Sequence, residues 1–131
     1  MKLGDIPACK TLNKAKRVKL AQDIYEQSSR CQELNELISV KNKDRYEPNV
    51  FLLKQMASNL LIDVKGDWDE GGIIPRLSLM LNSTELSLFK FKELSEKRGN
   101  CYIQYYDELV SKLEAIRCLI LKVTDTYIGE K

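Results

Sequence analysis

Four cysteines are the most reactive side chains in this 131-residue sequence, and their spacing limits what they can do. Cys9, Cys31, Cys101 and Cys118 include no Cys-x-x-Cys pair, which excludes a zinc ribbon and a thioredoxin-type redox motif. The sequence has 0 histidines, which removes Ser–His and Cys–His dyads and every histidine-containing zinc site. Cys101 is predicted at a helix start, where a thiol can acidify, but no histidine base is available. We therefore predict no catalytic site and no cofactor, and we expect reduced thiols, with Cys31 and Cys118 in the core.

One acidic cluster has some of the features of a metal site. Asp67, Asp69 and Glu70 are spaced like a fragment of a calcium-binding loop. The twelfth position, where such a loop needs a bidentate glutamate, is Ser78. A solvated acidic loop explains the cluster, and an enzyme with a metal in this loop is the least favoured hypothesis.

Basic side chains are densest near the start of the sequence, and no acidic residue interrupts them. These residues are Lys10, Lys14, Lys16, Arg17 and Lys19. Such a run attracts phosphates, although a solvated helix start has the same composition. The chain as a whole is nearly neutral, with 21 Lys and Arg against 19 Asp and Glu, so RNA or DNA would have to bind a local patch. Further candidate contacts for a nucleic acid are Lys54, Arg76, Arg98 and Arg117.

The composition is typical of one globular domain. Hydrophobic residues make up 44% of the chain and charged residues 31%, with only 6 glycines and 3 prolines. No apolar run approaches the ~20 residues that a membrane-spanning helix needs. The first residues include no apolar segment of the kind that directs secretion. We therefore expect a cytoplasmic protein that does not contact membranes.

The positions of the apolar residues predict four amphipathic helices after a flexible N-terminal tail at residues 1–12. Apolar residues recur every three or four positions, and Pro48, Gly66, Pro75 and Gly99 supply helix start and stop signals. The predicted helices span about residues 13–40, 48–65, 75–97 and 101–127. Short loops between long helices favour antiparallel neighbours. The predicted fold is therefore all-α, an up-down antiparallel four-helix bundle over residues 13–128.

Two of these helices have more apolar residues than one buried face requires. In the second helix, Phe51, Leu52 and Ile62 widen the apolar stripe, which predicts burial over much of its circumference. In the third helix, Leu79, Leu86 and Phe89 lie away from the main stripe. A surplus apolar face on a bundle helix indicates a partner, so these three residues are the predicted oligomer interface.

Several short segments are similar to one family of four-helix bundles, which includes the 23S rRNA intervening-sequence proteins and the accessory variability determinants of diversity-generating retroelements (Avd). The segment at residues 19–26, KLAQDIYE, resembles the opening helix of that family. The turn DRY at 44–46 and the segment LKQMASNL at 53–60 resemble its charged-Arg-Tyr turn and second helix. The strongest similarity is to its third helix, tight turn and fourth helix, and it comprises LNSTEL at 81–86, RG at 98–99, YDEL at 106–109 and LEAI at 113–116. The resemblance covers most of residues 15–123.

The resemblance implies a homo-oligomer, a ring of five bundles in the best-known members, without enzymatic activity. It also implies binding to a reverse transcriptase and to its template RNA through basic surfaces. The leading hypothesis is therefore a non-enzymatic accessory protein that scaffolds a reverse transcriptase and a nucleic acid. The alternative is a small helical RNA-binding subunit of a nucleoprotein effector complex, as in type III CRISPR systems.

Overall fold

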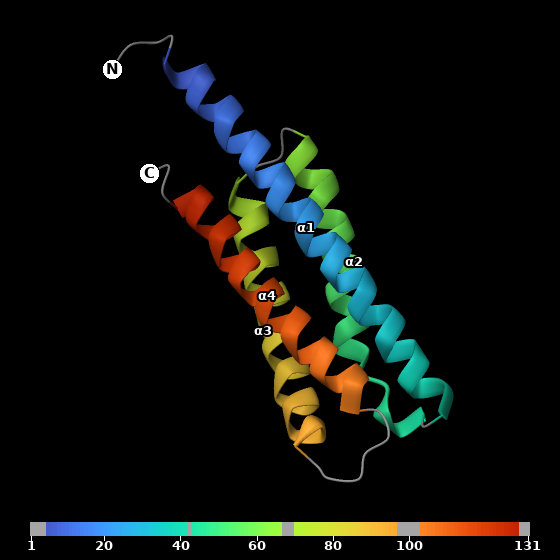
Figure 1. The fold of residues 1–131 in the computed structure, drawn as a ribbon. Helices are drawn as coiled ribbons and strands as arrows, with labels where there is room; N and C mark the ends of the chain where they lie inside the picture. Colours follow the sequence, from blue (N-terminus) through green and yellow to red (C-terminus); the bar gives the residue numbers. More distant parts are fainter. Residues whose placement is uncertain (1–4, 42, 67–69, 97–102, 129–131) are drawn as a thin grey trace.

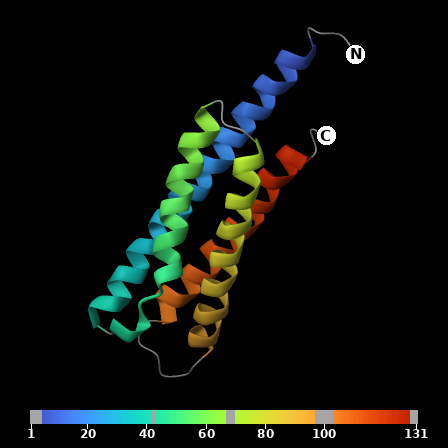
Figure 2. The ribbon, with the colours of Figure 1, turned by 180° about the vertical axis from the view of Figure 1, so that it is seen from behind.

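The computed structural model shows an all-α four-helix bundle (Figure 1). It describes the backbone of residues 5–41, 43–66, 70–96 and 103–128. Side chains are described within residues 14–40, 43–66, 72–96 and 104–128. The helices are α1 (Asp5–Lys41), α2 (Pro48–Lys65), α3 (Glu70–Ser95) and α4 (Ile103–Ile128), and a 3-10 turn, η1 (Lys43–Arg45), precedes α2. Successive helices run in opposite directions, and the helices pack in a closed cycle in which α1 contacts α2 and α4, and α3 contacts the same two (Figure 2). This is the predicted antiparallel up-down topology.

The core consists of the apolar stripes of all four helices, as their spacing predicted. Ile24, Leu53, Met80 and Leu113 represent the four helices in it, and each is fully buried. Between α3 and α4 the ring of Phe91 stacks on that of Tyr106, with 5.9 Å between centroids. In α3 the buried hydroxyl groups of Thr84 and Ser87 donate to backbone carbonyls one turn earlier, which satisfies them inside the core.

The helix bounds agree with the sequence prediction for α2 and differ from it for α1 and α3. Helix α2 has the predicted bounds, because Glu47 caps its first turn through Asn49 N–H and Gly66 ends it. Helix α1 begins at Asp5 rather than at Asn13, so residues 5–12 belong to the helix and not to a tail. Pro7 is tolerated there because it lies in the first turn, where a backbone N–H would make no hydrogen bond within the helix. Helix α3 begins at Glu70, and Pro75 lies inside it, because the extra turn buries Ile73.

Two burial predictions were wrong. Cys118 is exposed on α4 although it follows the apolar period, because Ile116 and Ile120 occupy the inward positions on either side of it. Phe51, Leu52 and Ile62 are also exposed, because α2 packs only on α1 and α3 and its opposite side has no neighbour within the chain. Helix α2 is therefore apolar over more of its circumference than the bundle buries.

No helix in the described part of the chain is both long and apolar enough to cross a lipid bilayer. This result agrees with the sequence expectation and concerns the helices alone.

Candidate functional site

The outward sides of α2 and α3 form the least charged surface among the described residues. Every exposed residue of α2 from Pro48 to Ile62 is uncharged, and Glu85 is the only charged one among the exposed residues of α3 from Gly72 to Phe89. We call the central part of this surface the neutral face, and it consists of Leu52, Gln55, Asn59 and Ile62 of α2 with Leu79, Asn82, Leu86 and Phe89 of α3.

The two halves of the neutral face come from neighbouring helices, because α2 packs against α3. Ion pairs fix the sides on which these helices face each other, since Asp63 pairs with Arg76, and Lys90 of α3 pairs with Glu47 at 3.4 Å. Leu52 lies eleven residues before Asp63, about three helical turns, and therefore shares its stripe. Leu86 lies one turn before Lys90, on the same side of α3. Leu52 and Leu86 therefore lie on the adjoining sides of α2 and α3.

The predicted interface residues lie on this neutral face. Phe89 is 74% exposed, Leu79 60% and Leu86 50%, which confirms that they lie away from the core stripe. Four other large apolar residues are exposed, but they occupy the last turn of α1 and the last two turns of α4: Leu37, Val40, Leu121 and Ile128. Most of the exposed large apolar side chains among the described residues therefore lie on α2 and α3.

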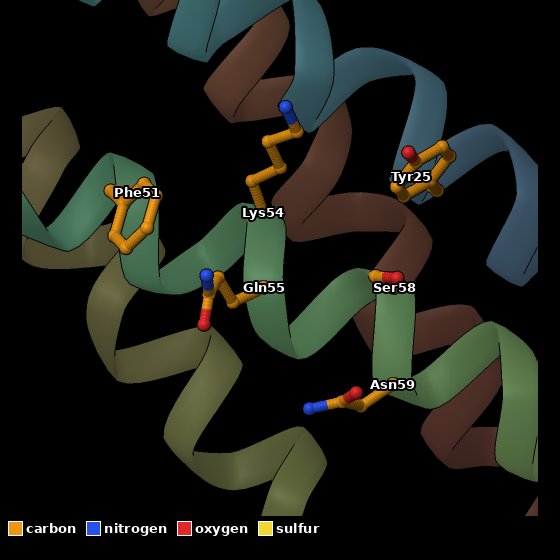
Figure 3. Close-up of a pocket in the computed structure, with 6 residues that line it drawn as sticks. All are labelled: Tyr25, Phe51, Lys54, Gln55, Ser58 and Asn59. Carbon is orange, nitrogen blue, oxygen red and sulfur yellow. The ribbon is translucent and has the colours of Figure 1, made fainter.

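A second feature is a groove of about 330 Å³ between α1 and α2. Figure 3 shows the side chain of Tyr25, from α1, and that of Phe51, from α2, at its two ends, with Lys54 between them (Figure 3). Gln55, Ser58 and Asn59 of α2 complete the lining. The groove thus combines two aromatic rings, one cation and three neutral polar groups, and none of its lining residues is acidic.

The predicted nucleic-acid contacts fall into different environments. Arg17 is 9% exposed: its Nε donates to Thr126 Oγ1 at 3.0 Å, its Nη2 donates to the Thr126 carbonyl at 2.8 Å, and its guanidinium lies 3.7 Å from the centre of the Tyr127 ring. Its charge therefore serves the contact between α1 and α4 rather than an exposed basic patch, which corrects the prediction. Arg76 is paired with Asp63.

The other predicted basic residues are more accessible. Lys14, Lys16 and Lys19 are exposed on the first half of α1. The N-terminal end of this helix extends past the ends of α2 and α4 (Figure 1). Lys54 lies in the groove and Arg117 is half-buried on α4. Lys10 belongs to α1, but its side chain lies outside those described, and Arg98 lies outside the described residues altogether.

Groups that could support catalysis or bind metal are not gathered at either surface. Burial raises the pKa of the Cys31 thiol to about 12, so this cysteine is an inert core residue. Among the described residues, no cluster of three histidine, cysteine or acidic side chains could hold a metal ion. Asp67 and Asp69 of the candidate calcium loop lie outside the described residues, as do the side chain of Glu70 and those of Cys9 and Cys101.

Sequence reasoning missed the groove and recognised only part of the neutral face. The groove combines Tyr25 with α2 residues more than 25 positions away, and their register depends on how α1 packs on α2. The neutral face had a readable signal, because Lys54 is the only charged residue from Pro48 to Ile62.

Comparisons with known proteins give no relative from which to transfer a role. No family model matches the chain, and no curated protein and no solved structure matches it at a significant level. Conclusions about function must therefore come from the two surfaces themselves.

Proposed function

We propose that this protein is a non-enzymatic, cytoplasmic scaffold that self-associates through the neutral face and brings a reverse transcriptase together with RNA or DNA. The observation that carries the proposal is the uncharged, apolar surface of α2 and α3, in a bundle whose other exposed positions are rich in charge. The subunit number that the sequence resemblance implies is five.

The chemistry of the neutral face suits a second copy of the same chain. Its polar groups are the amides of Gln55, Asn59 and Asn82, and an amide both donates and accepts hydrogen bonds. A surface of this kind can pair with its own copy without placing like charges opposite each other. The exposed leucines and Phe89 supply apolar area at the centre, where interfaces are depleted of charge.

The nucleic-acid part of the proposal depends on cations that are exposed. Lys16 and Lys19 have no ion-pair partner among the described residues and are exposed on α1, on either side of Arg17. In an oligomer this segment is repeated once per subunit, so several weak phosphate contacts act on one strand. The described cysteines, Cys31 and Cys118, are unpaired thiols, in keeping with a reducing compartment.

Size-exclusion chromatography with light scattering tests the assembly. We expect the wild type at micromolar concentration to have a multiple of the 15.1 kDa chain mass, five times that mass for a ring. The double substitution Leu79→Glu and Leu86→Glu places two charges at the centre of the neutral face and should reduce the mass to that of one chain. The matched control is Leu121→Glu, an exposed leucine on α4, which should leave the oligomer intact.

A wild-type mass of one chain would refute the proposal. An oligomer that survives the double substitution but dissociates with Leu121→Glu would place the interface on α4 and would likewise contradict it. Circular dichroism of each variant should show unchanged helicity, because all three leucines are exposed in the single chain.

A further inference from the structure

We infer that the groove between α1 and α2 binds a single-stranded nucleic acid, with bases stacked on the rings of Tyr25 and Phe51 and phosphates bound by Lys54 in the groove and by Lys65 beyond it. This inference rests on the proposed function and specifies the strand chemistry and the site. Within the described residues, the six side chains that line the groove make no hydrogen bond or ion pair with the rest of the chain. The two rings, the ammonium group of Lys54 and the hydroxyl of Ser58, which lie outside the neutral face, therefore remain available to a ligand.

The two rings provide the stacking surfaces. Phe51 is 41% exposed and Tyr25 is partly exposed, so each presents ring surface to the groove instead of burying it in the core. They come from different helices and lie at opposite ends of the groove, with Lys54 between them (Figure 3). Aromatic rings separated by a cation are the arrangement with which proteins hold successive bases and the phosphates between them.

The cation of the groove, Lys54, differs from several others in the bundle because no carboxylate among the described residues neutralises it. Arg30, Lys90 and Lys112 are engaged by glutamates within the chain. Lys54 and Lys65 have no ion-pair partner among the described residues, and they lie eleven positions apart on one stripe of α2, about 16 Å along the helix axis.

This basic stripe continues onto α1. The two helices are antiparallel, so the end of α2 at Lys65 lies beside the first half of α1, where Lys16 and Lys19 are exposed (Figure 1). A strand that enters the groove at Phe51 therefore meets Lys54 first, then Lys65 at the end of α2, and the lysines of α1 beyond that end. Such a track suits a polyanion longer than one nucleotide.

The two aromatic rings of the groove favour a single strand over a duplex or an acidic peptide as the ligand. A duplex keeps its base faces stacked inside the helix, where Tyr25 and Phe51 cannot reach them. An acidic peptide would use the lysines but would leave both rings without a role. The hydroxyl of Ser58 both accepts and donates, so it can contact any of the four bases without strong sequence preference.

Fluorescence anisotropy with fluorescein-labelled oligouridylate, oligothymidylate and a duplex of equal length tests the site. We expect both single strands to bind more tightly than the duplex. Phe51→Ala and Tyr25→Ala should each raise the dissociation constant for the single strands by about 5- to 100-fold, whereas Tyr25→Phe, which keeps the ring, should bind like the wild type. Lys54→Gln should reduce the slope of log affinity against log salt by about 0.7, the value for one phosphate contact on a single strand. A preference of the wild type for one of the two single strands would show whether RNA or DNA is the natural ligand.

Matched controls use the same chemistry outside the groove. Leu121→Ala removes an exposed apolar side chain from α4, and Lys122→Gln removes an exposed cation from the same helix; neither should change single-strand affinity by more than about twofold. Light scattering on each variant reports the oligomer independently. If Phe51→Ala and Tyr25→Ala bind like the wild type while Lys16→Glu with Lys19→Glu abolishes binding, the groove assignment is overturned and the scaffold proposal stands. If the wild type binds no single strand, or prefers the duplex, the inference is also overturned, and the oligomer mass then decides the assembly proposal separately.

Discussion

Helix α1 contacts its two neighbours through different kinds of hydrogen bond. The contact with α2 is a buried amide pair, and the contact with α4 is a charged pair near the surface. Against α2, the amide of Asn35 pairs with the backbone of Glu47: Asn35 Nδ2 donates to the Glu47 carbonyl at 2.9 Å, and Glu47 N–H donates to Asn35 Oδ1 at 3.0 Å. Against α4, the guanidinium of Arg30 donates to both carboxylate oxygens of Glu108, at 2.8 and 3.2 Å, near the surface.

The two contacts should respond differently to conditions. The Asn35–Glu47 amide pair is buried and joins an uncharged side chain to backbone groups. Salt and pH should therefore change its contribution to the free energy of unfolding very little. The Arg30–Glu108 pair is partly exposed, so solvent screens it and its two side chains lose entropy when they are ordered. We therefore expect the α1–α2 contact to contribute more to stability and the α1–α4 ion pair to carry the sensitivity to solution conditions.

Removing the amide of Asn35 should produce the largest effect. Asn35→Ala leaves the N–H of Glu47 buried without a partner and its carbonyl with one bond fewer, which should lower the free energy of unfolding by about 2–4 kcal/mol. Urea denaturation at low and high salt measures the loss, which should be the same at both. Ser39→Ala, which removes a more exposed hydroxyl one turn later, is the control and should change stability by less than about 0.5 kcal/mol. A loss for Asn35→Ala as small as the control's would contradict the comparison.

Arg17 is intermediate between the two cases because it is charged but buried. Arg17→Ala removes two hydrogen bonds to Thr126 and the contact with the Tyr127 ring, and should lower the free energy of unfolding by about 1–3 kcal/mol. Arg17→Lys should recover only part of this loss, because an ammonium cannot reproduce the planar fork of the guanidinium. Thermal unfolding monitored by circular dichroism measures both variants.

The control for Arg17 is Lys19→Ala, which removes an exposed cation two residues later and should leave stability nearly unchanged. If Arg17→Ala strongly lowers the affinity for single strands but leaves the free energy of unfolding unchanged, then Arg17 contacts nucleic acid and does not stabilise the α1–α4 contact.

These residues also show which parts of the molecule a sequence can predict. The four helices, the bounds of α2 and the core stripes followed from periodicity and from Pro48 and Gly66, which are local signals. The burial of Arg17 was not predicted because its partner Thr126 is 109 positions away, and only the packed bundle brings the two together. The groove at Tyr25 was not predicted for the same reason, because its lining depends on the register between two helices.

The smallest expected effect is that of Glu108→Gln, and pH makes it measurable. Hydrogen bonds from Arg30, assisted by the charge of Lys112, hold the pKa of the Glu108 carboxyl below its ordinary value of 4.5. A carboxylate with a lowered pKa stabilises the fold above the unfolded-state pKa and loses that contribution as pH falls through the folded-state value. Glu108→Gln should therefore reduce stability by less than about 1 kcal/mol at neutral pH. The difference from wild type should shrink as pH falls below 4.5, disappear once pH is below the folded-state pKa, and also shrink in high salt. Glu93→Gln, whose carboxylate has no ion-pair partner among the described residues, should show no such pH-dependent difference. A Glu108→Gln loss that is large and independent of pH would mean that the α1–α4 contact, like the α1–α2 contact, depends on buried geometry.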